Sequence, residues 1–277
     1  MEKQSSKFGL LYKLFGVLAI LLLIAAYFMP IWWVALQSHQ YPKSMYPKGI
    51  RIEFKYDGVY NGCEGVKERA EITTNEGADC LMEMTAINHY IGMYPIVQGS
   101  NSRVFDEVKE GQIIPVPEYY VFDTKRDADG EDVIDPKTGS PEQIDVTPQY
   151  LKFLNGILVN SKYIFLVFIL LIIYFIVTPK KKNAIFAFLP ALLPFYFLVL
   201  FAYSLYWYGH HLDLHGGGAF AGIKPFMPTM FGHGKVAQFE TLAYPYYGFL
   251  VDFMIFVLLV FSILFKRKYI ALQNTKQ

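Results

Sequence analysis

The residues best suited to bind a metal ion lie in two polar segments of this chain, each between long apolar stretches. Imidazole and thiolate groups bind copper and zinc, and thioether sulfur favours Cu(I). These segments hold every imidazole and thiol group of the chain: His39, His89, His210, His211, His215, His233, Cys63 and Cys80. If the apolar stretches cross a membrane, all of these groups lie on one side of it, and metal chemistry is predicted on that side.

The first candidate metal site lies between residues 79 and 93. It offers one imidazole and three thioether groups, those of His89, Met82, Met84 and Met93. His89 and Met93 are four residues apart, so they would share one face of a helix. Two interpretations of Cys63 and Cys80 remain open: a disulfide, as expected in an oxidising compartment, and thiolate ligation of copper beside the methionines.

The second candidate site is the connection between the third and fourth apolar stretches. It carries four histidines, two methionines and one aspartate: His210, His211, His215, His233, Met227, Met230 and Asp213. The glycines at 216–218 let the backbone turn sharply, so the imidazoles can converge. The alternative is that His210 and His211 lie at the membrane interface among aromatic residues and that the glycines form a hinge. The metal prediction also requires the two polar segments to meet in space, which their spacing does not establish.

Four apolar stretches predict four membrane spans. They are residues 10–36, 164–177, 184–207 and 249–265. About 20 such residues cross a hydrocarbon core of about 30 Å, and the spans must be helical because lipid offers no partners to backbone amides. Pro190 and Pro194 predict a kink in the third helix.

Basic residues next to the spans predict the orientation of the protein. They form three clusters: Lys3, Lys7 and Lys13; Lys180, Lys181 and Lys182; and Lys266, Arg267 and Lys268. With four crossings all three clusters fall on the same face, which the positive-inside rule assigns to the cytoplasm. The sequence therefore predicts a bacterial inner-membrane protein with both termini in the cytoplasm.

The predicted fold is an α-helical polytopic membrane protein with four transmembrane helices and a β-rich extracytoplasmic domain inserted between helices 1 and 2. Its predicted divisions are 1–36 (cytoplasmic N-terminus and helix 1), 37–152 (extracytoplasmic domain), 153–178 (helix 2), 179–183 (cytoplasmic loop), 184–208 (helix 3), 209–246 (extracytoplasmic His/Met-rich loop), 247–265 (helix 4) and 266–277 (cytoplasmic tail). Residues 49–56 alternate apolar and polar side chains before Asp57-Gly58, which predicts a strand and a tight turn. Residues 112–123 predict another strand, and residues 123–148 an exposed acidic loop.

Several classes of function lack support in the sequence. A net charge of +1 and a pI near 7.7 provide no basic surface for nucleic acid. No predicted span contains a histidine for haem ligation, and no serine or cysteine lies in a recognisable nucleophile motif, so no catalytic residue is predicted. Asp252 is the one acidic residue within a predicted span, near its outer end, and it supports a transport function only weakly.

Three short motifs carry a resemblance to a known family. They are residues 45–49 (Met-Tyr-Pro-Lys-Gly), residues 87–93 (Ile-Asn-His-Tyr-Ile-Gly-Met), and residues 208–213 (Tyr-Gly-His-His-Leu-Asp) followed by Pro-Phe-Met-Pro at 225–228. They resemble motifs of a little-characterised bacterial membrane-protein family that accompanies nitrous oxide reductase and its copper-delivery accessory proteins in denitrification gene clusters. The resemblance implies a role in copper handling, because that reductase contains multinuclear copper centres assembled outside the cytoplasm.

The sequence thus predicts an accessory protein, not an enzyme, that handles copper on the periplasmic side for maturation of a copper enzyme such as nitrous oxide reductase. Its predicted partners are the lipid bilayer and a periplasmic copper protein or copper-delivery protein. The alternative prediction is a membrane scaffold that binds no metal and docks a periplasmic partner protein.

Overall fold

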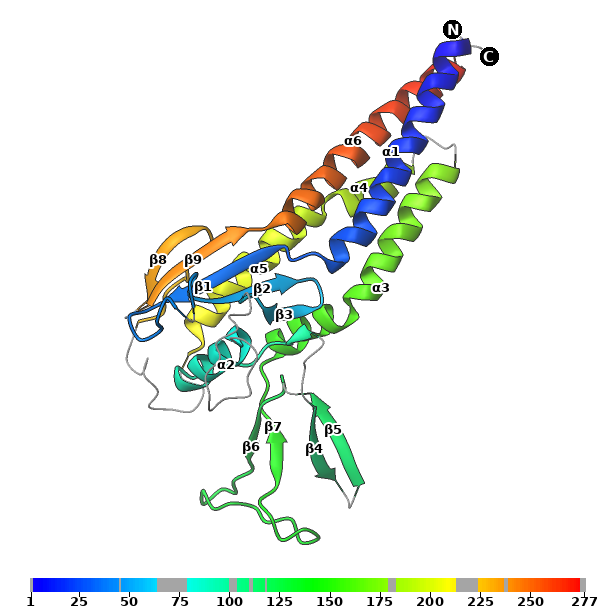
Figure 1. Cartoon of the computed structure of the whole chain (residues 1–277). Helices are drawn as coiled ribbons and strands as arrows, with labels where there is room; N and C mark the ends of the chain where they lie inside the picture. Colours follow the sequence, from blue (N-terminus) through cyan, green and yellow to red (C-terminus); the bar gives the residue numbers. More distant parts are fainter. Residues whose placement is uncertain are drawn as a thin grey trace, which may run out of the picture.

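The computed structural model of the chain describes residues 2–44, 46–63, 79–99, 104–109, 112–117, 119–178, 183–212, 224–236 and 239–274. The elements in chain order are α1 (Glu2–Phe28), β1 (Trp32–Gln37), β2 (Ile50–Lys55), β3 (Gly58–Asn61), α2 (Cys80–Tyr90), β4 (Val104–Lys109), β5 (Gln112–Pro117), β6 (Phe122–Thr124), β7 (Gln143–Asp145), α3 (Gln149–Val177), α4 (Ala184–Ala191), α5 (Leu193–His210), β8 (Gly232–Val236), β9 (Phe239–Pro245) and α6 (Tyr247–Asn274) (Figure 1). Together they form a helical bundle that joins a β-sheet at one end.

The bundle consists of α1, α3, α4 and α6, with α1 packed along α6 (Figure 1). Ala19 and Ala26 of α1 are fully buried, and their small side chains let the neighbouring helices approach closely. Leu23 of α1 packs in the same cluster with Ile255 and Leu259 of α6. The start of α1 and the end of α6 lie together at one end of the bundle, and the sheet lies at the other (Figure 1). We refer to these as the terminal end and the sheet end.

Three helices are long and apolar enough to cross a membrane: Ser6–Phe28, Gln149–Val177 and Tyr247–Asn274. The helices α4 and α5 pass the same test only as a pair, which is bent by 42°. The bend lies at Leu192, between Pro190 and Pro194, because proline removes a backbone donor and clashes with the preceding turn. The described residues therefore supply three spans, or four if the bent pair counts as one, and the predicted kink is confirmed.

The main sheet has five antiparallel strands in the order β3-β2-β1-β9-β8. In its centre β1 pairs with β2 on one side and with β9 on the other, so that Trp33 lies opposite both Glu53 and Tyr244. Strand β1 directly follows α1, and β9 directly precedes α6. The two polar segments that the sequence places between the spans therefore meet in one sheet.

Three predicted boundaries differ from the structure. The first helix ends at Phe28 and does not extend to residue 36, because Pro30 stops it and the following aromatic and β-branched residues form β1. The sheet is also more than an insertion at residues 37–152, since β1, β8 and β9 lie outside that range. The second spanning helix begins at Gln149, four residues before the predicted start.

Other local predictions are confirmed. The strands β2 and β3 form an antiparallel hairpin, in which Gly58 has a φ of 145° that favours glycine. Cys63 and Cys80 form a disulfide, with Cα atoms 5.7 Å apart, so their thiols are not free to ligate copper. The disulfide holds the start of α2 against the hairpin. Asp79 caps this helix by accepting hydrogen bonds from the backbone amides of Leu81 and Met82.

Two smaller hairpins lie apart from the main sheet (Figure 1). Strand β4 pairs with β5, and β6 pairs with β7. The predicted strand at residues 112–123 corresponds to β5 and the start of β6. The acidic segment at residues 123–148 is mostly exposed, as predicted, although β6 and β7 give it more regular structure than a loop.

Candidate functional site

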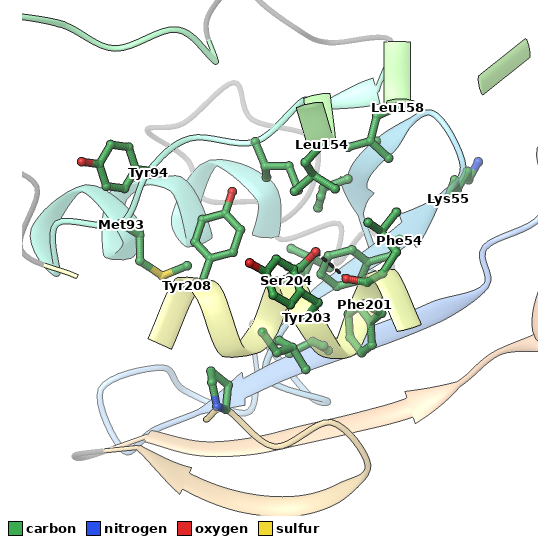
Figure 2. Close-up of a pocket in the computed structure, with 18 of the residues that line it drawn as sticks. Phe54, Lys55, Met93, Tyr94, Leu154, Leu158, Phe201, Tyr203, Ser204 and Tyr208 are labelled. Carbon is green, nitrogen blue, oxygen red and sulfur yellow. Dashed lines mark hydrogen bonds between the residues drawn. The ribbon is translucent and has the colours of Figure 1, made fainter. Parts of the chain in front are cut away.

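A large apolar cavity of about 780 Å³ lies between the main sheet and the helices α2, α3 and α5 (Figure 2). Its volume is within the range of about 300–1,000 Å³ that is usual for small-molecule sites. The wall residues come from four directions: Val34, Leu36, Ile52 and Phe54 from the sheet, Leu81 and Met84 from α2, Leu154 and Phe165 from α3, and Phe197 and Tyr208 from α5.

The alternation of side chains along the central strands creates the sheet wall of this cavity. Val34 and Leu36 of β1 lie on the same face as Ile52 and Phe54 of β2, because successive residues of a strand point to opposite faces. That face is apolar. The opposite face carries Arg51, whose guanidinium lies over the rings of Trp33 and Tyr246 at 4.7 and 4.8 Å.

The bend between α4 and α5 creates the helical walls. Near the terminal end α4 packs on α3, with the rings of Phe186 and Tyr174 4.9 Å apart. After the bend, α5 contacts α3 towards its far end, where the Tyr150 hydroxyl lies 2.7 Å from Ser204 Oγ. The cavity occupies the space between these two contacts.

The cavity opens along the outside of the molecule between α3 and α5. Three of its lining residues are strongly exposed: Val199 at 72%, Phe153 at 60% and Tyr203 at 51%. All three are apolar or aromatic. The mouth is therefore a hydrophobic opening between the two helices.

The interior of the cavity carries no charge in the part that the structure describes. Lys55 is the one charged residue among the described lining residues, and its ammonium lies over the Tyr60 ring at 4.3 Å. Figure 2 shows this side chain pointing away from the other labelled residues. Two other polar side chains of the lining form hydrogen bonds within the protein: Ser204 donates to the carbonyl of Leu200, and Gln98 donates to Thr85.

Two lining hydroxyls have no hydrogen-bond partner among the described residues. They belong to Tyr208 on α5 and Thr241 on β9, and both are buried. Figure 2 shows the Tyr208 ring rising from α5 into the space between Met93 and Leu154. A buried hydroxyl without a partner is costly, so each is a place where a ligand oxygen can bind.

A partly buried hydrogen bond joins the sheet to the bundle next to the cavity. The Tyr56 hydroxyl, in the turn between β2 and β3, donates to Asp252 Oδ2 of α6 at 2.6 Å. Asp252 is fully buried. Burial, and then the neighbouring Asp252, raise the pKa of Tyr56 well above its usual value. The sequence marks Asp252 as a lone acid in an apolar span, but nothing in the pattern identifies Tyr56 as its partner.

The predicted metal ligands on α2 lie in different environments. His89 and Met82 are exposed, whereas Met84 is buried in the cluster beneath the disulfide. Met84 and Met93 line the cavity. Both methionines are therefore part of an apolar wall.

The predicted ligands at the end of α5 stack on aromatic rings. The imidazoles of His210 and His211 lie 4.0 and 4.2 Å from the rings of Tyr206 and Trp207, as the interfacial alternative predicts. Each Nδ1 is 2.8 Å from the carbonyl oxygen four residues earlier. Because a carbonyl only accepts, each Nδ1 carries the proton and Nε2 keeps its lone pair.

The remaining predicted ligands are dispersed. His233 lies exposed on β8, Met227 is exposed and Met230 is half-buried. His215 and Asp213 lie outside the described residues. Within the described ranges, no three His, Cys, Asp or Glu side chains come together in a way that could hold a metal ion. The two segments meet through their strands, and their described histidines do not form one cluster.

Comparison of the chain with protein-family models, with curated proteins and with solved structures finds no match. The family resemblance carried by the three sequence motifs therefore stays a prediction.

Proposed function

We propose that this protein binds the hydrocarbon chain of a membrane lipid in the cavity between the sheet, α3 and α5. The observation that carries the proposal is the continuity of this cavity. Phe165, Phe168 and Leu193 line one part of it and belong to membrane-spanning helices, whereas Leu81 and Met84 line another part and belong to the sheet domain.

The lengths of the helices support a membrane boundary that crosses the cavity. Residues 247–266 of α6, from Tyr247 to the buried Lys266, extend about 28 Å at about 1.5 Å per residue, close to the thickness of a hydrocarbon core. On α3 the exposed Lys162 marks the corresponding position at the sheet end. Phe165 lies on the membrane side of Lys162, and Leu154 on the other. Ile164 also lines the cavity, is 37% exposed and lies on the membrane side of Lys162, so a lipid chain can enter beside it from the adjoining leaflet.

The energetics favour reversible binding. Each buried CH₂ group gains about 0.8 kcal/mol on leaving water, but a chain that leaves a bilayer for an apolar cavity gains almost none of this. Shape and polar contacts must then decide which lipid is bound. Such a cavity suits a protein that accepts a lipid and passes it on.

The orientation predicted from the basic residues puts the sheet outside the cytoplasm in this proposal. Lys7, Lys13 and Arg267 belong to the helices that meet at the terminal end of the bundle. The Cys63–Cys80 disulfide supports the same orientation, because disulfides persist in oxidising compartments. The bound lipid would come from the outer leaflet of a bacterial inner membrane.

Native mass spectrometry of the detergent-purified protein tests this function. We expect about one retained lipid per chain in the wild type. Leu158→Trp should weaken retention, because Leu158 lines the cavity and an indole at this position would project into it. Leu166→Trp is the matched control on the same helix, since Leu166 is 52% exposed and is not among the lining residues. A wild type without lipid, or equal retention in Leu158→Trp, would contradict the proposal.

Copper handling is the second candidate, and one observation favours it. The Nδ1–H groups of His210 and His211 donate to backbone carbonyls, which is the usual arrangement for a histidine that binds a metal through Nε2. In this proposal the protein holds or passes copper for maturation of a copper enzyme such as nitrous oxide reductase. The scaffold alternative, which docks a periplasmic partner without metal, stays a prediction of the sequence.

The stoichiometry of Cu(I) bound under reducing conditions tests the copper proposal. If it holds, the wild type retains copper, and the His210→Ala/His211→Ala double variant and the His89→Ala variant lose it. Leu158→Trp serves as the control, because it blocks the cavity and leaves these imidazoles intact. Absence of retained copper from the wild type would rule this candidate out.

A further inference from the structure

The hydroxyl of Tyr208 is a polar group enclosed by the apolar wall of the cavity. Tyr208 is 8% exposed, and its hydroxyl has no hydrogen-bond partner among the described residues. The ring packs in a cluster with Leu151 and Leu154 of α3, next to Met93 and Tyr94. Figure 2 shows the ring directed into the space that these residues enclose.

The neighbouring polar groups do not satisfy this hydroxyl. Tyr150 and Ser204 bond each other, and Ser204 also donates to its own helix. Thr241, on the sheet wall, has a second buried hydroxyl that lacks a described partner. Because an unpaired buried hydroxyl is unfavourable, the cavity is complementary to a ligand that brings an oxygen acceptor.

The lack of a charged group in the described interior restricts the class of ligand further. No described lining side chain directs a charge into the interior, since the Lys55 ammonium lies over Tyr60. An anionic head group would therefore lose its hydration there without gaining a counter-ion. A neutral carbonyl oxygen accepts a hydrogen bond without this penalty.

We infer that the ligand is a neutral long-chain lipid with a carbonyl oxygen, and that the Tyr208 hydroxyl donates a hydrogen bond to that oxygen. This inference rests on the proposed lipid-binding function and specifies its ligand class. Two membrane sources share the chemistry, namely the ester carbonyl of an uncharged acyl lipid and the ring carbonyl of an isoprenoid quinone. The hydrocarbon chain occupies the apolar remainder of the cavity.

Competition binding to the full-length protein in detergent micelles tests the inference, with native mass spectrometry as the readout. Three probes share a sixteen-carbon chain: methyl palmitate is a neutral ester, palmitate is an anion and hexadecane has no oxygen. Decylubiquinone is the fourth probe and presents the quinone carbonyl. We expect the wild type to bind methyl palmitate or decylubiquinone at least about tenfold more tightly than hexadecane, and palmitate more weakly than its methyl ester.

Tyr208→Phe keeps the ring and removes only the hydroxyl. We expect it to lower the affinity for the preferred carbonyl probe about tenfold and to leave hexadecane binding unchanged. A loss confined to methyl palmitate identifies an ester ligand, and a loss confined to decylubiquinone identifies a quinone. Tyr150→Phe is the control, because its hydroxyl is already paired with Ser204 and its loss should not change the preference.

The results of these binding experiments distinguish failure of the inference from failure of the proposed lipid-binding function. Equal affinities of Tyr208→Phe and the wild type for both carbonyl probes, with hexadecane still bound, would overturn the inference and leave the lipid-binding function intact. Tighter binding of palmitate than of methyl palmitate would also overturn it. If the wild type binds none of the four probes, the proposed function itself fails.

Discussion

The hydrogen bond between Tyr56 and Asp252 should anchor the sheet to the bundle, and Tyr56→Phe removes it. The two residues are 196 positions apart, and their oxygen atoms lie 2.6 Å from each other. Asp252 is fully buried, and its other oxygen has no partner among the described residues. The variant therefore leaves a buried carboxyl group without this donor.

The expected loss follows from the full burial of Asp252, the acceptor of this bond. Removing one partner of a buried hydrogen bond costs about 1–3 kcal/mol. At about 2–4 °C per kcal/mol for proteins of about 150–250 residues, the melting temperature should fall by about 2–12 °C. Tyr60→Phe is the matched control in the same hairpin. Its hydroxyl donates to Asp57 at 2.7 Å, but Asp57 is half-buried whereas Asp252 is fully buried, so the loss should be smaller.

A double-mutant cycle in detergent isolates the pair from other effects of each substitution. The cycle compares Tyr56→Phe, Asp252→Leu and the double variant by thermal unfolding. We expect a coupling free energy of about 1 kcal/mol or more, since the residues are in direct contact. Additive losses, or a Tyr56→Phe variant as stable as the wild type, would refute the anchoring role.

Three further predictions concern the stability of the fold. Lys266 donates to the carbonyls of Phe175 and Thr178 at the end of α3. Lys266→Met should therefore destabilise the bundle by about 1–3 kcal/mol in a thermal scan, while the exposed Lys268→Met should not. The Cys63–Cys80 disulfide closes a sequence separation of 17, so dithiothreitol should cost about 3 kcal/mol, and no shift in melting temperature would contradict its structural role. The pKa of Tyr56 is raised by burial and then by Asp252, so the unfolded chain ionises first and stability should fall as the pH rises above about 10. This fall should be shallower in Tyr56→Phe, and an unchanged slope would contradict the assignment.

The sequence predicts those features that depend on neighbouring residues. Span length follows from the apolar runs, and the bend at Leu192 follows from Pro190 and Pro194. The β2–β3 hairpin follows from its alternation and from Asp57-Gly58, and the disulfide follows from two cysteines in one polar segment. Each of these has a local physical cause.

The sequence did not predict the features that depend on contacts between distant residues. An apolar run such as residues 31–36 suits a helix or a buried strand equally well, and only its pairing with β2 and with β9, some 200 residues later, makes it a strand. The cavity has no sequence signal of its own, because it arises from the divergence of α5 from α3 after the bend. The metal prediction rested on the types of residue in the two polar segments. Residue types alone do not determine which side chains lie close together in the fold.

The most direct test of the account is a cryo-electron microscopy map of the protein in lipid nanodiscs. We predict elongated density that begins beside Phe168, on the membrane side of Lys162, and ends within hydrogen-bond distance of the Tyr208 hydroxyl. A cavity that contains no such density, or that is closed by contact between α3 and α5, would contradict lipid binding at this site.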